Sequence, residues 1–356
     1  MEDLELLDLL DESTTTENSA DPVPENQELS RMLSLHTPVP TLFTAAERDD
    51  EAQATGSGPF RKIGAGACGL IFAQDGKSVV YKLAKVDNDE LWNDRIMHER
   101  IAREFYRFAI DEVKVPECYY FIPQRRFGNN PELVDAAKDL CNLPTCALIT
   151  ERIPPLPSQT RHQLIEKYCS PRIKKQAHAD PANQDCLVRV YLGSMQGKIG
   201  GLFFSLRNLK PHFNHMIELK LDIKTLSRRM GIALAVLHWA AKTDARDVEF
   251  VLGSSTNKDN TGVEEPEGYF DHITELFVLD FNQVRAITMD DDGVALAVEA
   301  WRLNDPYYPR PLGNTGVERF AWRTFQEQGN TLLNLPRKFI LVIIAVERAR
   351  MESRVA

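Results

Sequence analysis

Three carboxylates stand close together just before an apolar run. Asp244, Asp247 and Glu249 fall within six consecutive positions, and the apolar residues 250–252 follow directly. A carboxylate can accept a proton from a reacting hydroxyl, and hard cations such as Mg²⁺ take oxygen ligands. The segment is therefore either a site for such chemistry or a solvated loop that leads into a buried strand.

A second candidate is a glycine-rich turn with Gly64, Gly66 and Gly69. Strand-forming residues lie on both sides of it, and a hairpin turn follows at 75–76. A dinucleotide-binding glycine motif would lead into a helix, so this pattern argues against a Rossmann fold. Glycines in a hairpin let backbone N–H groups approach phosphate oxygens without a Cβ in the way.

Lys82 lies one strand later, between apolar residues in "VVYKLA". A half-buried ammonium group without a partner is costly, so Lys82 needs an anion nearby. The following segment, "LWNDRIMHERIAREFYRFAI", has apolar residues near a 3.6-residue period and is predicted to be a helix. Glu99 on this helix is the first candidate partner and Glu104 the second. The alternative for either glutamate is a solvated helix face.

In this order, the glycines, Lys82 and Glu99 resemble the protein-kinase-like superfamily, which includes protein kinases and the aminoglycoside and other small-molecule phosphotransferases. The resemblance continues at "ALITERIPPLP", similar to the strand that leads to the hinge between two lobes. It continues again at "ELFVLDFNQV", which is similar to the magnesium-binding D-F-G element. It implies an α+β, two-lobed protein-kinase-like fold with a small β-rich N-lobe and a mainly helical C-lobe.

The resemblance also implies roles for these residues. Lys82, oriented by Glu99, binds the α- and β-phosphates of ATP beneath the glycine hairpin. Asp280 and Glu249 hold magnesium, and Asp244 orients or deprotonates the acceptor hydroxyl.

At the hinge, Thr150 is expected to border the adenine pocket. Backbone groups of Glu151 and Ile153 are expected to bond the adenine base.

Several positions depart from the superfamily's pattern. No H-R-D motif is present, and His238 is expected to pack in the core. Asn282 takes the place of the D-F-G glycine, and Glu249 takes the place of the usual metal-binding Asn. Asp247 either pairs with a neighbouring cation or lines the site. These departures leave nucleotide binding open and weaken the prediction of turnover.

The short stretch after Asp280 holds no A-P-E element, which disfavours peptide phosphorylation, whereas the long span 154–236 suits the substrate side of a small-molecule enzyme. The predicted function is an ATP-dependent phosphotransferase acting on a small-molecule hydroxyl. A catalytically inactive scaffold with an acidic docking tail is the alternative, and a structural protein without a nucleotide site is a third possibility.

Residues 60–335 also look like a fungal family of unknown function whose members are labelled zinc finger proteins, through "RVYLGS" and "NDPYYPRP" among other stretches. The six cysteines form no C-x-x-C pair, so the sequence predicts reduced thiols and no zinc site.

Charge and composition mark one boundary in the chain. Residues 1–54 hold fourteen acidic residues against two arginines, so residues 1–55 are predicted to be a disordered acidic tail. The resemblance implies that residues 56–150 form the N-lobe and that residues 151–356 form the hinge and the C-lobe. Within the tail, "LELLDLL" has leucines at helical spacing, so residues 1–54 are a candidate docking segment for a protein partner. The alternative is an acidic tail that is merely solvated.

Other functional classes are excluded by composition. The apolar run at 339–346 is much shorter than the ~20 residues of a membrane-spanning helix. No segment is both basic and aromatic enough to predict nucleic-acid binding. The acidic N-terminus is unlike a secretory or organellar signal, so the protein is expected in the cytoplasm or the nucleus.

Overall fold

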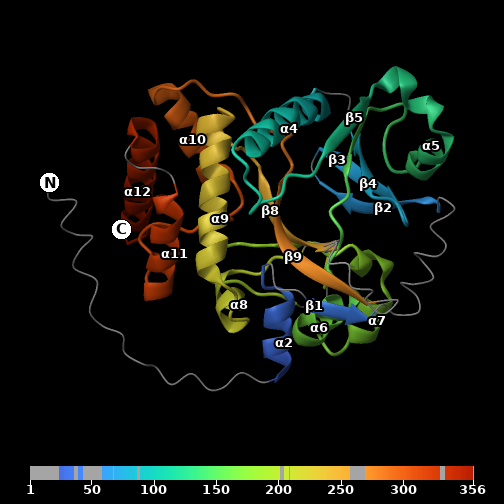
Figure 1. Ribbon diagram of the computed structural model, residues 1–356, viewed down its shortest axis with the longest axis horizontal. Helices are drawn as coiled ribbons and strands as arrows, with labels where there is room; N and C mark the ends of the chain where they lie inside the picture. The colour runs from blue at the N-terminus through green and yellow to red at the C-terminus, as the bar shows by residue number, and fades with distance from the viewer. Residues whose placement is uncertain are drawn as a thin grey trace, which may run out of the picture.

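The chain is a mixed α+β protein with a β-rich N-terminal region and a mainly helical C-terminal part (Figure 1). The computed structural model describes residues 24–35, 39–42, 58–66, 68–85, 89–200, 204–207, 209–256, 269–328 and 333–355.

The N-terminal region is built on a five-stranded antiparallel sheet with the strand order β2-β3-β4-β6-β5. The strands are β2 (Phe60–Ala65), β3 (Gly69–Gln74), β4 (Val79–Ala84), β5 (Cys118–Ile122) and β6 (Ala147–Glu151). The helices of this region are α4 (Glu90–Arg107), η1 (Gln124–Asn129) and α5 (Pro131–Ala137). Phe72 and Leu83 are fully buried beneath α5 and hold the sheet against it.

A second sheet, of four strands in the order β1-β9-β8-β7, lies in the C-terminal part. Its strands are β1 (Val39–Leu42), β7 (Val188–Arg189), β8 (Glu249–Thr256) and β9 (Tyr269–Leu279). The β8–β9 register sets Glu249 opposite Leu279. This pairing brings the start of β8 beside Asp280, the residue that follows β9.

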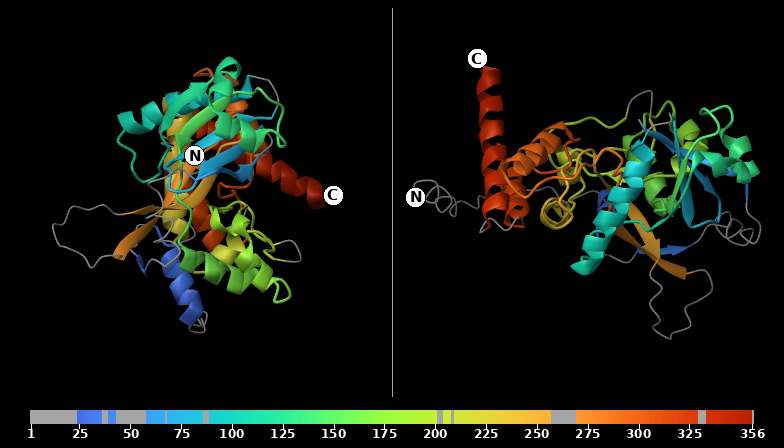
Figure 2. Two further views of the ribbon diagram at one scale, coloured as in Figure 1. Left: turned by 90° about the vertical axis from the view of Figure 1, so that its right-hand side faces the viewer. Right: turned by 90° about the horizontal axis from the view of Figure 1, so that it is seen from above.

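Helices surround this sheet (Figure 1). They are α6 (Ser158–Tyr168), α7 (Lys174–Ala179), η2 (Pro181–Gln184), α8 (Phe213–Glu218), α9 (Ile223–Ala235), the π-helical turn η3 (Val236–Ala240), α10 (Asp291–Leu303), α11 (Gly316–Glu327) and α12 (Asn334–Val355). Phe250, Phe281 and Trp301 are among the large side chains buried in their common core. Helix α12 projects at the edge of the molecule (Figure 2).

Part of the tail that was predicted to be disordered forms ordered elements. Helix α2 (Pro24–Met32) buries Leu29 against the main core, and the Thr274 hydroxyl donates to the Met32 carbonyl at 2.6 Å. Strand β1 extends the edge of the second sheet by pairing with β9. Leucine and methionine on one helix face outweigh the acidic composition here because they bury apolar area. The leucines of "LELLDLL" lie outside the described residues.

Two expectations from composition can be compared with the described residues. None of their helices combines the length and the hydrophobicity needed to cross a membrane. The six cysteines all lie within the described residues, and none of them forms a disulfide.

Candidate functional site

A cleft of about 500 Å³ lies between the five-stranded sheet and the C-terminal part. It brings together residues that are far apart in the sequence. Nine of the residues predicted for the site line it: Gly64, Gly66, Gly69, Lys82, Thr150, Glu151, Ile153, Glu249 and Asp280. Two predicted residues, Glu99 and Asp244, do not line it.

Lys82 forms the centre of an ion-pair network at this cleft. Its ammonium group lies 2.6 Å from Asp94 Oδ2 and 2.6 Å from Asp280 Oδ1. Burial alone would lower the pKa of Lys82, but the two carboxylates raise it, so the lysine stays charged. The network joins β4, α4 and the segment after β9.

The predicted partner of Lys82 was wrong, since Asp94 takes the place assigned to Glu99. Glu99 pairs with Arg95 at 2.9 Å along the helix surface, and Glu104 pairs with Arg107 at 3.3 Å. Asp94 lies three residues after the buried Leu91, so it shares the buried face of α4. Residues spaced by three or four lie on one side of a helix, and this periodicity was the signal that could have identified Asp94.

Asp280 has a left-handed backbone conformation with φ of 67°. This region is strained for residues other than glycine, and such strain concentrates at functional sites. The following residue, Phe281, donates its N–H to Asp94 Oδ1 at 3.2 Å and packs its ring against His98. The positive φ therefore falls on Asp280. It does not fall on Asn282, which takes the place of the glycine of the D-F-G element.

Asn282 links the segment after β9 to the glycine hairpin. Its side-chain amide donates to the Cys68 sulfur at 2.7 Å. Its backbone carbonyl accepts a hydrogen bond from the side-chain amide of Asn93 on α4 at 2.9 Å. Burial, together with a hydrogen bond to Glu90, raises the pKa of the Cys68 thiol to about 12. Cys68 is thus held as a protonated thiol, which argues against a redox role.

The glycine hairpin approaches Lys82 closely at Gly69. A Cβ at Gly69 would lie 2.9 Å from the Leu83 carbonyl oxygen and 3.1 Å from the Lys82 side chain. Gly66 donates its N–H to the Gly69 carbonyl at 2.9 Å and has open space where a Cβ would be. The absence of a side chain at Gly69 therefore lets the hairpin lie directly over the lysine.

Asp244 is a structural residue, contrary to the prediction that it faces the acceptor. Its side chain is 0% exposed and accepts hydrogen bonds from the N–H groups of Arg246 and Arg285 at 3.0 and 2.9 Å. The Arg285 guanidinium also donates to it at 2.7 Å. Its two oxygens are occupied by these donors, so Asp244 fixes the loop and does not reach the cleft.

Asp247 is the carboxylate of this loop that lines the cleft. It has φ of 61°, its N–H donates to Asn304 Oδ1 at 2.7 Å, and Gln283 donates to its Oδ2 at 2.6 Å. Burial and the nearby charge of Asp280 raise its pKa. These contacts present a positioned carboxylate with one oxygen free of donors in the described part of the chain.

Glu249 lines the cleft, but its carboxylate already has a cationic partner. Its Oε1 lies 2.7 Å from the Arg189 guanidinium. Burial raises the pKa of Glu249 to about 7, although Arg189 acts in the opposite direction. A carboxylate that is paired and partly protonated near neutral pH does not fit the predicted role of metal ligand as well as Asp280 does.

The segment after β6, which was predicted to be a hinge, has a backbone N–H group that is available to a ligand. The Glu151 N–H donates to the Glu117 carbonyl at 2.8 Å, and the Arg152 N–H donates to the Ser78 carbonyl at 2.8 Å. The Ile153 N–H has no acceptor among the described residues, and Ile153 lines the cleft beside Thr150. Of the predicted base-binding groups, the Ile153 N–H is thus available to a ligand.

The residues of the cleft fit a magnesium ion better than a zinc ion. The described residues contain no group of three or more His, Cys, Asp or Glu side chains arranged to hold a metal by themselves. Mg²⁺ is commonly held by one or two carboxylates together with phosphate oxygens of the substrate. Asp280 and Asp247, which influence each other electrostatically, supply such a pair.

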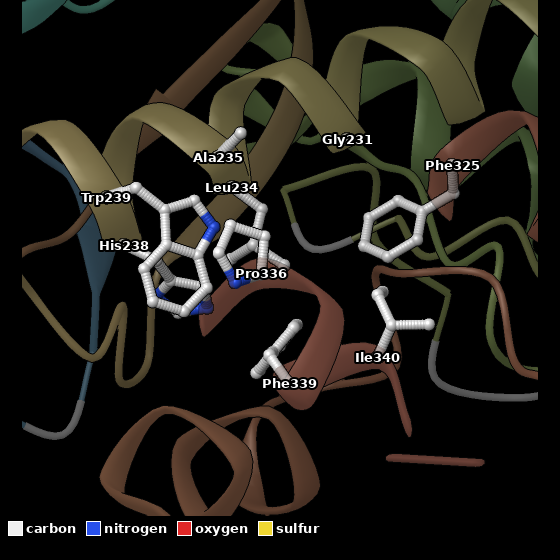
Figure 3. A pocket seen from close by; sticks show the side chains of 9 residues that line it. All are labelled: Gly231, Leu234, Ala235, His238, Trp239, Phe325, Pro336, Phe339 and Ile340. Atoms are coloured by element: carbon white, nitrogen blue, oxygen red, sulfur yellow. The ribbon is translucent and has the colours of Figure 1, made fainter. Parts of the chain in front are cut away.

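A much smaller hollow of about 20 Å³ lies among α9, η3, α11 and α12 (Figure 3). Phe325, Phe339 and Ile340 line it, together with His238. His238 is buried as the sequence predicted, and its Nδ1 lies 2.9 Å from the Thr243 carbonyl. A hollow of this size holds about one water molecule, so it is not a substrate site.

Comparison with known proteins gives one family match. Residues 276–331 match the family model DUF3669, described as "Zinc finger protein". A search of curated proteins finds no match. The matched segment includes Asp280 and α10 but contains neither cysteine nor histidine, so it lacks the usual zinc ligands. The chain is thus similar over this segment to proteins that carry the zinc finger label.

Proposed function

We propose that this protein has a two-lobed, protein-kinase-like fold and transfers the γ-phosphoryl group of ATP to a hydroxyl of a small molecule. The N-lobe is the five-stranded sheet with α4, the hinge follows β6, and the C-lobe is the helical part. The observation that carries the proposal is the 2.6 Å contact between Lys82 and Asp280, residues 198 positions apart, in a cleft roofed by the glycine hairpin.

In this proposal Lys82 neutralises the phosphates of ATP, and Asp94 orients it in the place first assigned to Glu99. The glycine hairpin covers the phosphates with backbone N–H groups. The Ile153 N–H donates to the base. Asp280 would hold a magnesium ion, and the ion when bound would neutralise charge on the phosphates.

Asp247 replaces Asp244 as the residue that meets the acceptor. Asp247 lines the cleft, and Gln283 and Asn304 hold it in place. It orients the acceptor hydroxyl and accepts its proton as the oxygen attacks phosphorus. Catalysis in this superfamily consists mainly of positioning and charge neutralisation, which these residues provide.

The first experiment measures binding of Mg-ATP to the purified full chain by isothermal titration calorimetry. Lys82→Ala and Asp280→Ala are expected to weaken binding by at least about tenfold. Glu99→Ala is the matched control, because Glu99 is a carboxylate of the same helix as Asp94 and its ion pair in the described part of the chain is with Arg95. Equal affinity for the wild type and both cleft variants would contradict the proposal.

A catalytically inactive, nucleotide-binding scaffold is the second candidate. The Glu249–Arg189 ion pair favours it, because it occupies the position at which protein kinases place a second metal ligand. ATP turnover decides between the two candidates. Slow ATP hydrolysis that is lost in Asp247→Asn supports the enzyme, whereas binding without any hydrolysis supports the scaffold.

A further inference from the structure

A second hollow of about 500 Å³ lies outside the cleft, where α10 and α12 meet the segment 304–311. It shares no residue with the cleft. Arginine side chains dominate its wall, which is formed by Arg302, Arg310, Val346, Glu347, Ala349, Arg350 and Ser353.

Arg310 is the most buried of these arginines. Its side chain is 17% exposed, and its guanidinium stacks on the Trp301 ring at 4.3 Å from the ring centroid. Glu347 lies 3.5 Å away, too far for a good hydrogen bond, and Arg310 donates no hydrogen bond within the described residues. A guanidinium carries five N–H donors, so Arg310 keeps donors that can turn to an anion in the hollow.

The charges around the hollow do not balance. Three guanidiniums face a single carboxylate, Glu347, so the wall carries two uncompensated positive charges. Arg350 shares Glu347 with Arg310, at 3.1 Å, and Arg302 has no ion pair in the described part of the chain. Burial lowers the pKa of Arg310, and the nearby Arg350 charge acts in the same direction, while Glu347 acts against both.

We propose that this hollow binds a phosphate group, either as inorganic phosphate or as a phosphate monoester. A phosphate dianion matches the two uncompensated charges and supplies oxygens for several guanidinium donors at once. Arg310 is suited to this role because the stacking on Trp301 holds its planar fork in place before the anion arrives. The volume also leaves room for the organic part of a monoester. The site is independent of the proposed function, since none of its residues touches the cleft.

Calorimetry on the full chain tests the proposal, with inorganic phosphate, glycerol 3-phosphate and acetate as probes at constant ionic strength. All proteins carry Lys82→Ala, so that phosphate does not bind in the cleft. Arg302→Ala with Arg350→Ala is expected to weaken phosphate binding at least about tenfold. Arg348→Ala, an exposed arginine of α12 that does not line the hollow, is the matched control and is expected to leave affinity unchanged.

A second variant separates loss of the site from loss of the fold. Arg310→Lys keeps the charge but removes the fork, so phosphate should bind several-fold more weakly while the thermal unfolding curve stays close to that of the parent. Tighter binding of glycerol 3-phosphate assigns the site to monoesters, and equal binding assigns it to inorganic phosphate. Acetate binding as tight as phosphate, unchanged affinity in the double variant, or no phosphate binding at about 10 mM would overturn the proposal.

Discussion

The loop 243–249 has a buried side and a side that faces the cleft, and each side carries an aspartate with a different role. On the buried side, Asp244 accepts from two backbone N–H groups and the Arg285 guanidinium. On the cleft side, Asp247 accepts from Gln283 and keeps one oxygen free within the described part of the chain. Both residues are carboxylates, so residue type does not distinguish them. The number of hydrogen bonds that each carboxylate already accepts from the protein separates a structural residue from a candidate catalytic residue.

Removing a carboxylate from each side should therefore destabilise the protein to very different extents. Asp244→Ala leaves two N–H groups of the loop and the half-exposed Arg285 guanidinium without their acceptor, and it is expected to lower the free energy of unfolding by about 3 kcal/mol. Asp247→Ala is expected to lower it by less than about 1 kcal/mol, because it loses one bond from Gln283. Urea denaturation measures both, and equal losses would remove the distinction between the two sides.

The buried side also predicts a pH effect through His238, which contacts Thr243. Burial lowers the pKa of His238 to about 4 from an ordinary value of 6.5. Between these values the unfolded state binds a proton and the folded state does not, so stability decreases as pH falls from 6.5 to 4, by about 3 kcal/mol. Unfolding measured across this range should show a smaller slope in His238→Gln, and an unchanged slope would contradict the assignment.

The cleft side predicts a pH effect of opposite sign through Glu249. Its pKa is raised to about 7 in the folded state, from an ordinary value of 4.5. The folded state keeps the proton in this interval, so the contribution of Glu249 makes the protein less stable as pH rises from 4.5 to 7, by up to about 3 kcal/mol.

The free energy of unfolding of the wild type and of Glu249→Gln is measured across this pH range in the presence of a chelator, which excludes metal ions. The difference between the two proteins isolates the contribution of Glu249 from that of His238. A difference that stays constant from pH 4.5 to 7 would show that Arg189 keeps Glu249 ionised throughout.

The contacts that hold Asp247 should affect turnover more than binding. Gln283→Ala removes the donor at 2.6 Å and is expected to reduce the rate of ATP turnover about tenfold, with the affinity for Mg-ATP nearly unchanged. Steady-state kinetics and calorimetry on the same preparations check this prediction. Loss of affinity without loss of rate would assign Gln283 to the nucleotide and not to Asp247.

The smallest effect is expected at Glu99, the residue first assigned as the partner of Lys82. Glu99→Ala breaks an exposed pair with Arg95 and is expected to change the free energy of unfolding by less than about 0.5 kcal/mol. Asp94→Ala, by contrast, should unfold at markedly lower denaturant concentration because it removes a buried partner of Lys82. Similar denaturant midpoints of unfolding for Glu99→Ala and Asp94→Ala would restore Glu99 as a candidate partner of Lys82.

Local patterns in the sequence were sufficient to identify the glycine hairpin, Lys82 and the strand that ends just before Asp280. Each is set by residues that are neighbours in the chain: strand formers on both sides of a turn, a lysine within an apolar strand, and an aspartate after one. The general α+β character follows from the same patterns. Composition was less informative about the tail. Its many acidic residues predicted disorder, but a few apolar contacts are enough to hold α2 against the core.

The tertiary structure decided which carboxylate does what. Asp94 contacts Lys82 because the buried face of α4 packs toward β4, and Asp244 is enclosed because Arg285, 41 residues further along, turns back onto it. Spacing along the chain cannot distinguish Asp244 from Asp247, since both precede the same strand. Their difference arises from left-handed turns at Ala245 and Asp247 and from donors supplied by distant segments. Hydrogen-bond saturation is a property of three-dimensional neighbours, and only the folded chain assigns those neighbours.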